Sequence, residues 1–178
     1  MEIQNTATTV PAMDLLESGI WQSVSPRYAT ELRINILIYS ALLIAFPWLI
    51  YFLEKDFPLN VIIAANIAAL TAFAFLAFVW VPKRVRFTQY LLRELDMNMR
   101  KGCWWRTTIS LGINRIQHME VTQGPVERWL GLSKLTLYTA GGHQSDLKLP
   151  GLETAEAKKL KVQLLKQVAR EEVDEELL

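Results

Sequence analysis

The residue types that most often carry out chemistry are few in this chain of 178 residues. It contains two histidines, His118 and His143, and one cysteine, Cys103. Neither histidine has a second His or Cys at the spacing of metal ligands, and Glu120 would share a strand face with His118 as a surface pair, so no metal site is predicted. Cys103 has no nearby helix start or general base, which favours a packed, unreactive thiol. A single cysteine also excludes an intrachain disulfide, in keeping with a reducing compartment.

The stretch HQSD, residues 143–146, contains the residue types of a hydrolase triad. Adjacent residues on a strand point to opposite faces and cannot form the required relay by themselves, so a polar hairpin strand is the better interpretation. The chain has no glycine-rich phosphate loop and no recognisable nucleic-acid module. We therefore predict no enzyme, no cofactor and no nucleic-acid partner. An enzyme would need His143, Asp146 and a third polar residue to meet in a pocket.

Basic and aromatic residues form the set that could bind a ligand. From Lys83 to Pro150 the chain has eleven basic and five acidic residues. Close to a membrane, such a surplus attracts anionic headgroups with about 1 kcal/mol per Lys or Arg. The candidate contacts for a membrane surface or a ligand are Lys83, Arg84, Arg86, Arg100, Lys101, Trp104, Trp105 and Arg106.

Parts of this set also have a simpler interpretation. The basic cluster at residues 83–86 is what topology alone requires after an inward-facing membrane span. Near the turn at Gly102, strand alternation predicts that either Trp104 or Trp105 faces the core. The other indole is then either an interfacial anchor or a packing residue against the final helix or a partner.

Two apolar runs precede this basic region. Residues 34–53 and 59–81 carry no formal charge. At about 1.5 Å per residue, a helix of either length crosses a hydrocarbon core of roughly 30 Å. The loop at residues 54–58 is so short that two antiparallel spans are the simplest arrangement. The alternative, two buried helices of a soluble core, fits poorly because a domain this small would not bury two such runs.

The flanking charges predict the orientation of the spans. Arg27 and Arg33 precede the first span and residues 83–86 follow the second, whereas the loop holds only Lys55 between two acids. Both termini are therefore predicted to be cytoplasmic, with residues 1–33 as an N-terminal and juxtamembrane segment. Its part WQSVSPRY, residues 21–28, suits the headgroup zone. The first twenty residues lack Lys, Arg and a continuous apolar stretch, so no cleaved signal peptide is predicted.

Small residues recur in the second span. Ala64, Ala68 and Ala72 follow one another at four-residue spacing, and Asn66 is the one strongly polar side chain deep in the run. Small side chains allow close approach of another helix, and an amide can hydrogen-bond across the contact. We predict that these four residues pack inside the membrane, against the first span or another protein. A pore would need more polar groups.

The pattern after residue 81 changes to short segments separated by turn residues, which indicates a small antiparallel β domain over residues 82–170. Two strands are expected within 86–102, meeting near Arg93 and Glu94, and the later strands are expected at 103–111, 115–123, 133–139 and 143–149, the last two joined by a tip at 140–142.

An amphipathic helix over residues 154–170 closes the predicted domain. Ala157, Leu160, Leu164 and Val168 share one of its faces, and Thr154 is a plausible N-cap. Residues 171–178 carry five acids and no base, which favours a solvated acidic tail.

Together these features resemble a known family. Two spans, a Y-L pair early in the domain, a glycine between early strands, the stretch RIQHMEVTQGPVERWLGLSKLTLYTAGG and a leucine-rich final helix are similar to the YdbS-like bacterial membrane proteins, which carry a bacterial pleckstrin-homology-like domain. The resemblance covers residues 21–168. It implies two nearly orthogonal antiparallel sheets that form a partly open barrel, capped by the last helix.

The resemblance also implies roles for residues 124–137. Gly124 and Pro125 would break the fourth strand, and residues 126–131 would form a short connecting turn. Trp129 and Leu130 would then pack in the core or at its rim, while the inward-facing residues of the next strand would be Leu135 and Leu137.

The implied location is the bacterial cytoplasmic (inner) membrane, crossed more than once. We predict a non-enzymatic, membrane-anchored binding or assembly module that presents a pleckstrin-homology-like domain at the cytoplasmic face. Its expected partners are membrane lipids and another membrane protein, such as a related protein with several copies of the domain. The alternative is an accessory subunit of a transport or export complex that docks through the alanine stripe and Asn66. Lipid binding itself rests here on analogy between folds.

Overall fold

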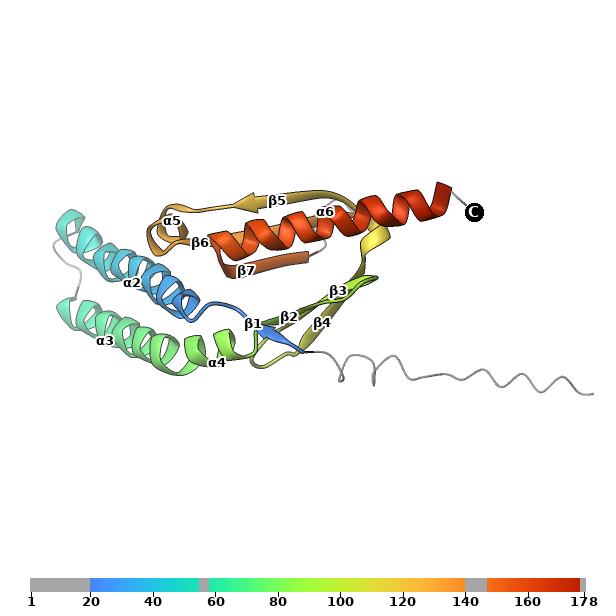
Figure 1. The fold of residues 1–178 in the computed structure, drawn as a ribbon. Coiled ribbons are helices and arrows are strands. Elements are labelled where there is room, and N and C mark those ends of the chain that lie inside the picture. Colours follow the sequence, from blue (N-terminus) through green and yellow to red (C-terminus); the bar gives the residue numbers. More distant parts are fainter. Residues whose placement is uncertain (1–19, 55–57, 140–146, 177–178) are drawn as a thin grey trace, which may run out of the picture.

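The protein consists of a long helical hairpin and a β domain covered by a C-terminal helix (Figure 1). The structure is a computed structural model, and it describes residues 20–54, 58–139 and 147–176. The predicted glycine tip at 140–142 and the stretch HQSD, including His143, lie outside the described residues.

The hairpin is built from the two apolar runs. Helix α2 (Arg27–Leu53) forms one arm, and α3 (Leu59–Phe75), a π turn η1 (Leu76–Trp80) and α4 (Val81–Arg86) form the other as one continuous helix. Both arms are long and apolar enough to cross a membrane, and of their most apolar windows 0% and 17% are buried within the protein. Most of these apolar side chains therefore face away from the rest of the chain.

The two arms are joined by a polar contact near the β domain. A π turn widens the helix and changes the pairing of its backbone carbonyl groups. Arg33 on α2 donates from its Nε to the carbonyl oxygen of Ala77 in this turn, at 3.2 Å. The cation thus bonds the second arm at the end where the hairpin meets the domain.

The β domain contains two antiparallel sheets. The first has the order β1-β2-β3-β4, and the second has the order β5-β6-β7 (Figure 1). The strands are β1 (Gln22–Ser23), β2 (Gln89–Leu92), β3 (Asp96–Lys101), β4 (Thr107–Gly112), β5 (Ile116–Thr122), β6 (Leu132–Thr139) and β7 (Leu147–Glu153).

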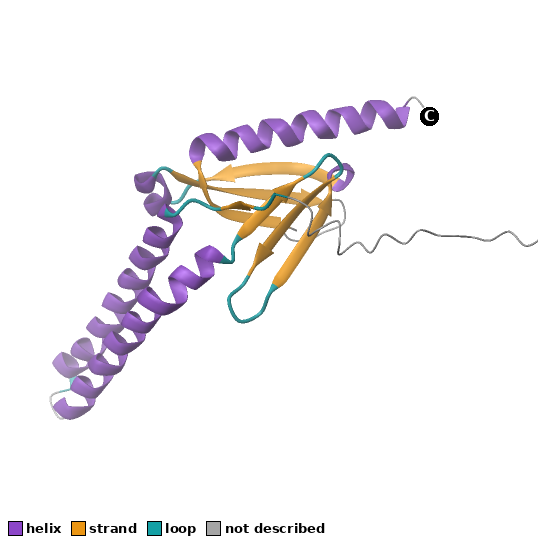
Figure 2. Cartoon of the chain, turned by 60° about the horizontal axis from the view of Figure 1, so that its bottom comes forward, coloured by secondary structure: helices purple, strands orange, loops and turns teal. Residues whose placement is uncertain are grey.

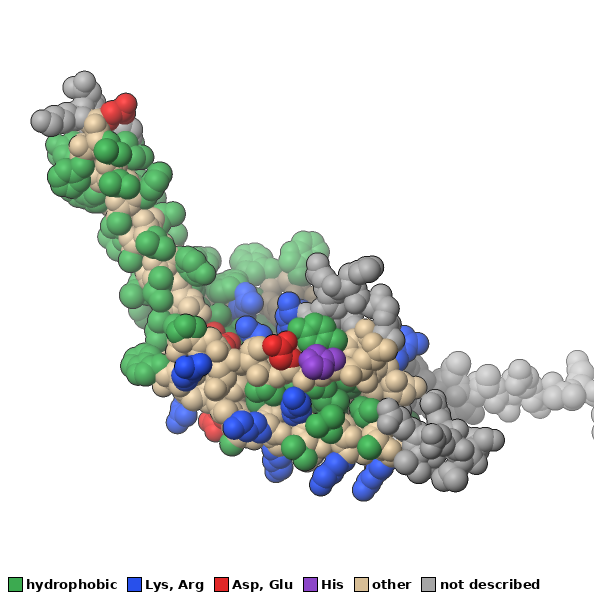
Figure 3. Space-filling model, turned by 90° about the horizontal axis from the view of Figure 1, so that it is seen from above, with side chains coloured by type: hydrophobic (Ala, Val, Ile, Leu, Met, Phe, Trp, Pro, Cys, Tyr) green, Lys and Arg blue, Asp and Glu red, His purple; other side chains and the backbone are tan. Residues whose placement is uncertain are grey.

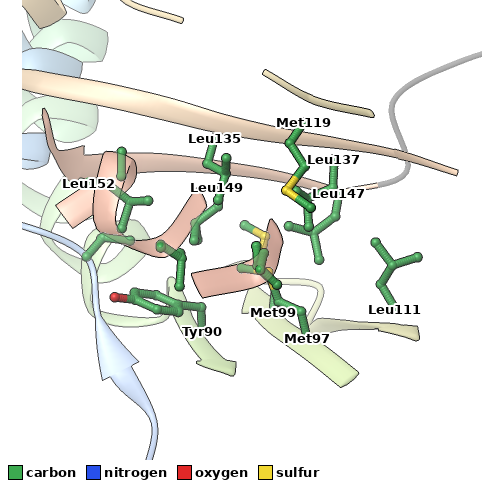
Figure 4. Packing of buried hydrophobic residues seen from close by; sticks show 14 of the residues in the cluster. Tyr90, Met97, Met99, Leu111, Met119, Leu135, Leu137, Leu147, Leu149 and Leu152 are labelled. Atoms are coloured by element: carbon green, nitrogen blue, oxygen red, sulfur yellow. The ribbon is translucent and has the colours of Figure 1, made fainter. Parts of the chain in front are cut away.

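The core lies between these sheets and the helix α6 (Thr154–Glu176). Met97 and Met99 of β3 face leucines of β6 and β7 across the interior (Figure 4). Helix α6 contributes the predicted buried face, Ala157, Leu160 and Leu164. The predicted antiparallel β domain with a covering helix is confirmed. Leu135 and Leu137, expected to point inward, are fully buried.

Tyr90 connects the first sheet to this helix. Its ring is buried, and its hydroxyl donates a hydrogen bond to Glu156 at 2.6 Å. Burial, followed by this hydrogen bond, raises the pKa of Tyr90 above its ordinary value. The phenol therefore stays protonated and holds the first turn of α6 on the sheet.

Several boundaries differ from those predicted. The strand expected from residue 103 begins only at Thr107, because Gly102 has a φ of +112° and turns the chain into a loop. Strand β7 extends to Glu153, and α6 continues to Glu176 through residues predicted as an acidic tail. Glutamate is a good helix former, so an acidic composition alone does not end a helix.

The segment before α2 belongs to the β domain. We expected residues 21–28 to lie along the headgroups, but Gln22 pairs with Tyr90, and the backbone N–H of Ser25 donates to the carbonyl of Gly151 at 2.8 Å. Tyr28 is buried in the core. The hairpin is therefore an insertion between two neighbouring strands of one sheet, β1 and β2 (Figure 1).

The cover of the core depends on the inner face of α6, where Leu164 is fully buried. We expect Leu164→Ala to lower the free energy of unfolding by about 2–5 kcal/mol, because a fully buried leucine leaves a cavity. Leu165→Ala, at a neighbouring position that is 49% exposed, is the matched control and should change stability by less than about 1 kcal/mol. Thermal unfolding in mild detergent measures both, and equal losses would contradict the packing.

Two glycines allow a second comparison. Gly131 and Gly151 have φ values of +69° and +72°, so alanine strains the backbone at either site, by about 1–2 kcal/mol. At Gly151 the added Cβ would also lie 2.5 Å from Cγ of Tyr28, whereas at Gly131 the nearest atom is 3.9 Å away. We expect Gly151→Ala to be the more destabilising substitution by at least about 1 kcal/mol in the same measurement. Equal effects would show that Tyr28 does not pack tightly there.

Candidate functional site

The loop between β3 and β4 carries two exposed indoles. Trp104 is 79% exposed and Trp105 is 87% exposed, so the prediction that one of them faces the core is wrong. The reason is that alternation applies to a strand, and residues 102–106 form a loop. This loop projects on the same side of the domain as the helical hairpin (Figure 2).

A cavity of about 510 Å³ lies between this loop and the foot of the hairpin; we call it the inner pocket. Four cations line it, and they come from four elements: α4, β3, β6 and β7. None of its described lining residues is acidic. The residues used below are Trp80, Arg84, Lys101, Trp104, Trp105, Lys134 and Lys148.

A second cavity, of about 470 Å³, also borders this loop; we call it the outer pocket. It shares Lys101, Gly102 and Thr107 with the inner pocket, and again no described lining residue is acidic. Its aromatic lining is limited to Phe87. Its cations are Arg86, Arg100, Lys101 and Arg106.

Aromatic rings hold several of these cations in place. The guanidinium carbon of Arg84 lies 4.7 Å from the ring centroid of Trp80, that of Arg100 lies 3.8 Å from Trp21, and that of Arg106 lies 5.2 Å from Phe87. Stacking on a ring orients a guanidinium without neutralising its charge. These three arginines therefore remain able to bind an anion.

Lys134 is the lining cation that has a carboxylate partner. Its Nζ lies 3.6 Å from Glu127, which also accepts a hydrogen bond from the backbone N–H of Gly124 at the start of α5 (Pro125–Leu130). Glu31 of α2 is buried as well, and its Oε2 has no hydrogen-bond partner in the described part of the chain. Neither carboxyl group lines either of the two pockets.

The structure brings together most of the predicted surface contacts. Arg84, Trp104 and Trp105 line the inner pocket, three other predicted residues line the outer one, and Lys101 lines both. Lys83 is exposed on α4 but lines neither pocket. Cys103, expected to be packed, is only partly buried at the inner pocket.

The alanine stripe of the second arm points away from α2. Ala64, Ala68 and Ala72 are exposed, whereas the buried residues of α3 are Ile62 and Ala69. Asn66 is partly buried, and its Oδ1 has no hydrogen-bond partner among the described residues. The stripe thus leaves one face of the hairpin open to another helix.

The remaining candidates from the sequence lie elsewhere. The ring of His118 is 5.7 Å from that of Tyr138, whose hydroxyl donates to Glu120 at 3.0 Å on the surface of β5 and β6. Within the described residues, no group of three or more His, Cys, Asp or Glu side chains is placed to hold a metal. Trp129, expected in the core or at its rim, is 78% exposed on α5.

Sequence reasoning missed Lys134 and Lys148 as partners of the loop. Lys148 lies between Leu147 and Leu149, both buried, and this alternation predicts that it points out of the core. Alternation thus predicts which face of β7 carries Lys148, but it does not predict which residues lie beside that lysine. Only the packing of β7 beside the foot of the hairpin places this lysine and Arg84 in one cavity.

Comparisons with known proteins define the family. The family model described as bacterial PH domain matches residues 27–168. The searches of curated proteins and of solved structures gave no significant match. The matched region includes both arms of the hairpin, both sheets from β2 onward and most of α6, which is well over half of the chain. The chain therefore belongs to the bacterial PH domain family.

Proposed function

We propose that this protein is a membrane-anchored, non-enzymatic binding module that holds its PH domain against an anionic membrane surface. The observation that carries the proposal is the loop at residues 102–106, where two exposed indoles lie among cations at the foot of an apolar hairpin. Tryptophan prefers the interface between headgroups and hydrocarbon, and Lys and Arg attract anionic headgroups. The same loop can therefore use both kinds of contact.

The hairpin supports the anchor. Figure 3 shows it as an apolar arm, while Lys and Arg side chains are spread over the visible face of the domain. Leaving so many large apolar side chains in water is unfavourable, whereas lipid covers them at no such cost. We further propose the bacterial cytoplasmic membrane as the location, with both termini in the cytoplasm, because basic residues flank the domain end of both arms.

A second candidate function is an accessory subunit of a transport or export complex. The observation that favours it is the outward-facing stripe Ala64, Ala68 and Ala72, which allows another membrane helix to approach closely. Purification in mild detergent separates the two functions. A transporter that remains stoichiometrically bound would support the subunit, and replacing Ala68 with leucine should then release it.

Alkaline extraction and thiol labelling test the anchor and its orientation. We expect the protein to remain in bacterial membranes after carbonate treatment. A membrane-impermeant maleimide should modify Cys103 in inverted membrane vesicles but not in intact cells, because the loop is proposed to be cytoplasmic. Release by carbonate would contradict the anchor, and labelling in intact cells would contradict the orientation.

The single cysteine also tests the surface contact. With an environment-sensitive fluorophore on Cys103, the full-length protein in nanodiscs should give a blue-shifted emission with anionic lipid relative to neutral lipid. The shift should decrease at about 0.5 M salt, because screening then acts over a few ångströms. The triple variant Arg100→Gln, Lys101→Gln and Arg106→Gln should lose most of it.

The matched control removes equal charge from the opposite side of the domain. Lys158, Lys159 and Lys161 lie on α6, so their replacement by glutamine should leave the shift unchanged. Equal loss in both triple variants would mean that net charge, and not the loop, causes the response. The full chain is required, because residues 83–178 alone lack β1 and the buried side chain of Tyr28.

A further inference from the structure

We propose that the inner pocket is a specific site for one phosphate group, carried either by a phospholipid or by a soluble phosphate ester. The proposal rests on the proposed function, because it assumes that the loop lies at a membrane. It goes further in assigning a single site with a defined chemistry. General attraction to an anionic surface needs no cavity, whereas a bound phosphate needs convergent donors.

The first argument is the origin of the cations. Basic residues next to a span can be explained by topology, and Arg84, on α4 at the end of the second arm, is close enough to the apolar run for that explanation. Lys134 and Lys148 are not, since they belong to β6 and β7 and reach this place only through the fold. Their convergence with Arg84 and Lys101 on one cavity without a described acidic lining residue is the signature of an anion site.

The second argument is the geometry of Arg84. Its guanidinium is stacked on Trp80, which restricts the side chain before any ligand arrives. A planar guanidinium can bind two phosphate oxygens at once, and pre-ordering reduces the entropy lost on binding. Lys101 and Lys148 supply further donors, while Lys134 remains partly neutralised by Glu127.

The third argument is the aromatic half of the lining. Trp80, Trp104 and Trp105 border the same cavity, and Trp80 ends the π turn of the membrane arm. The cavity of about 510 Å³ falls in the size range of small-molecule sites, roughly 300–1,000 Å³. Cations beside indoles at the depth of the headgroups match a phosphate attached to an apolar chain.

The outer pocket provides the contrast. If Lys101, which lines both pockets, is left out, the outer pocket has as many cations as the inner one, namely Arg86, Arg100 and Arg106. Unlike the inner pocket, it has no tryptophan among its described lining residues. We assign surface attraction to the outer pocket and phosphate binding to the inner one. Charge-matched variants can therefore separate the two, because each pocket has exposed cations that the other lacks.

The experiment is native mass spectrometry of the full-length protein in mild detergent, titrated with phosphatidic acid, phosphatidylglycerol or oleate. We expect one phospholipid to bind before any others, and oleate, an anionic amphiphile without phosphate, to bind at least about tenfold more weakly. Arg84→Gln with Lys148→Gln should weaken phospholipid binding at least about tenfold. Arg86→Gln with Arg106→Gln, which removes the same charge, should change it less than about twofold.

Soluble probes identify the source of the phosphate. If glycerol 3-phosphate or inorganic phosphate displaces the lipid at comparable concentration, the site is supported with a soluble ester as its ligand. If neither soluble probe displaces the lipid, the phosphate site is still supported, and its ligand is a phospholipid. Equal losses in the two double variants, or oleate binding as tight as that of phosphatidic acid, would overturn the proposal.

A different measurement tests the proposed function separately from the inner pocket. In the nanodisc assay with labelled Cys103, the double variant at Arg84 and Lys148 should retain the response to anionic lipid, because the outer cations are intact. Loss of phospholipid binding with a retained response supports the inner site. Should the double variant unfold, Lys148→Glu alone tests the same site, since Lys148 is exposed on β7 and its reversal should also abolish the first binding event.

Discussion

The pairing of two short strands determines how the rest of the molecule is arranged. Strand β1 is only two residues long, yet it pairs Gln22 with Tyr90 and Ser23 with Gln89 across the whole of the intervening hairpin. The backbone bond from Ser25 to Gly151 and the bond from Arg33 to Ala77 add to this closure. Because both arms end at one sheet, the domain has a fixed orientation relative to the hairpin and does not hang on a flexible tether.

This fixed orientation explains why charge accumulates at one place. The β3–β4 loop, the end of β7 and the last turns of the second arm meet where the hairpin leaves the domain. Arginines there stack on aromatic rings instead of pairing with carboxylates, so their charge is available to an anion. The buried residues Glu31 and Glu127 lie outside the two cavities, so neither carboxyl group occupies either site.

Local patterns in the sequence predict most of the elements but not the site. Alternation identifies Leu135 and Leu137 as core residues, and uninterrupted apolar runs identify the two arms. Two residues are too few to show any alternation, so β1 cannot be predicted from the sequence before its partner strand is known. The exposure of both indoles depends on the positive φ of Gly102, and the approach of Lys148 to Arg84 depends on how two sheets pack. Both features depend on tertiary structure, so they cannot be predicted from the periodicity of apolar residues in the sequence.

The insertion of the hairpin between β1 and β2 also sets an order of events during synthesis. Strand β1 leaves the ribosome before both apolar arms, and its partner follows them. If the hairpin crosses a membrane as proposed, the two strands can pair only when they end on the same side of the bilayer, which requires both arms to integrate as a pair. A chain in which one arm fails to integrate would leave Tyr28 and the edge of β2 without their partners. On the proposed topology, completion of the domain would therefore depend on correct insertion, and a misinserted chain would present an open, protease-sensitive core.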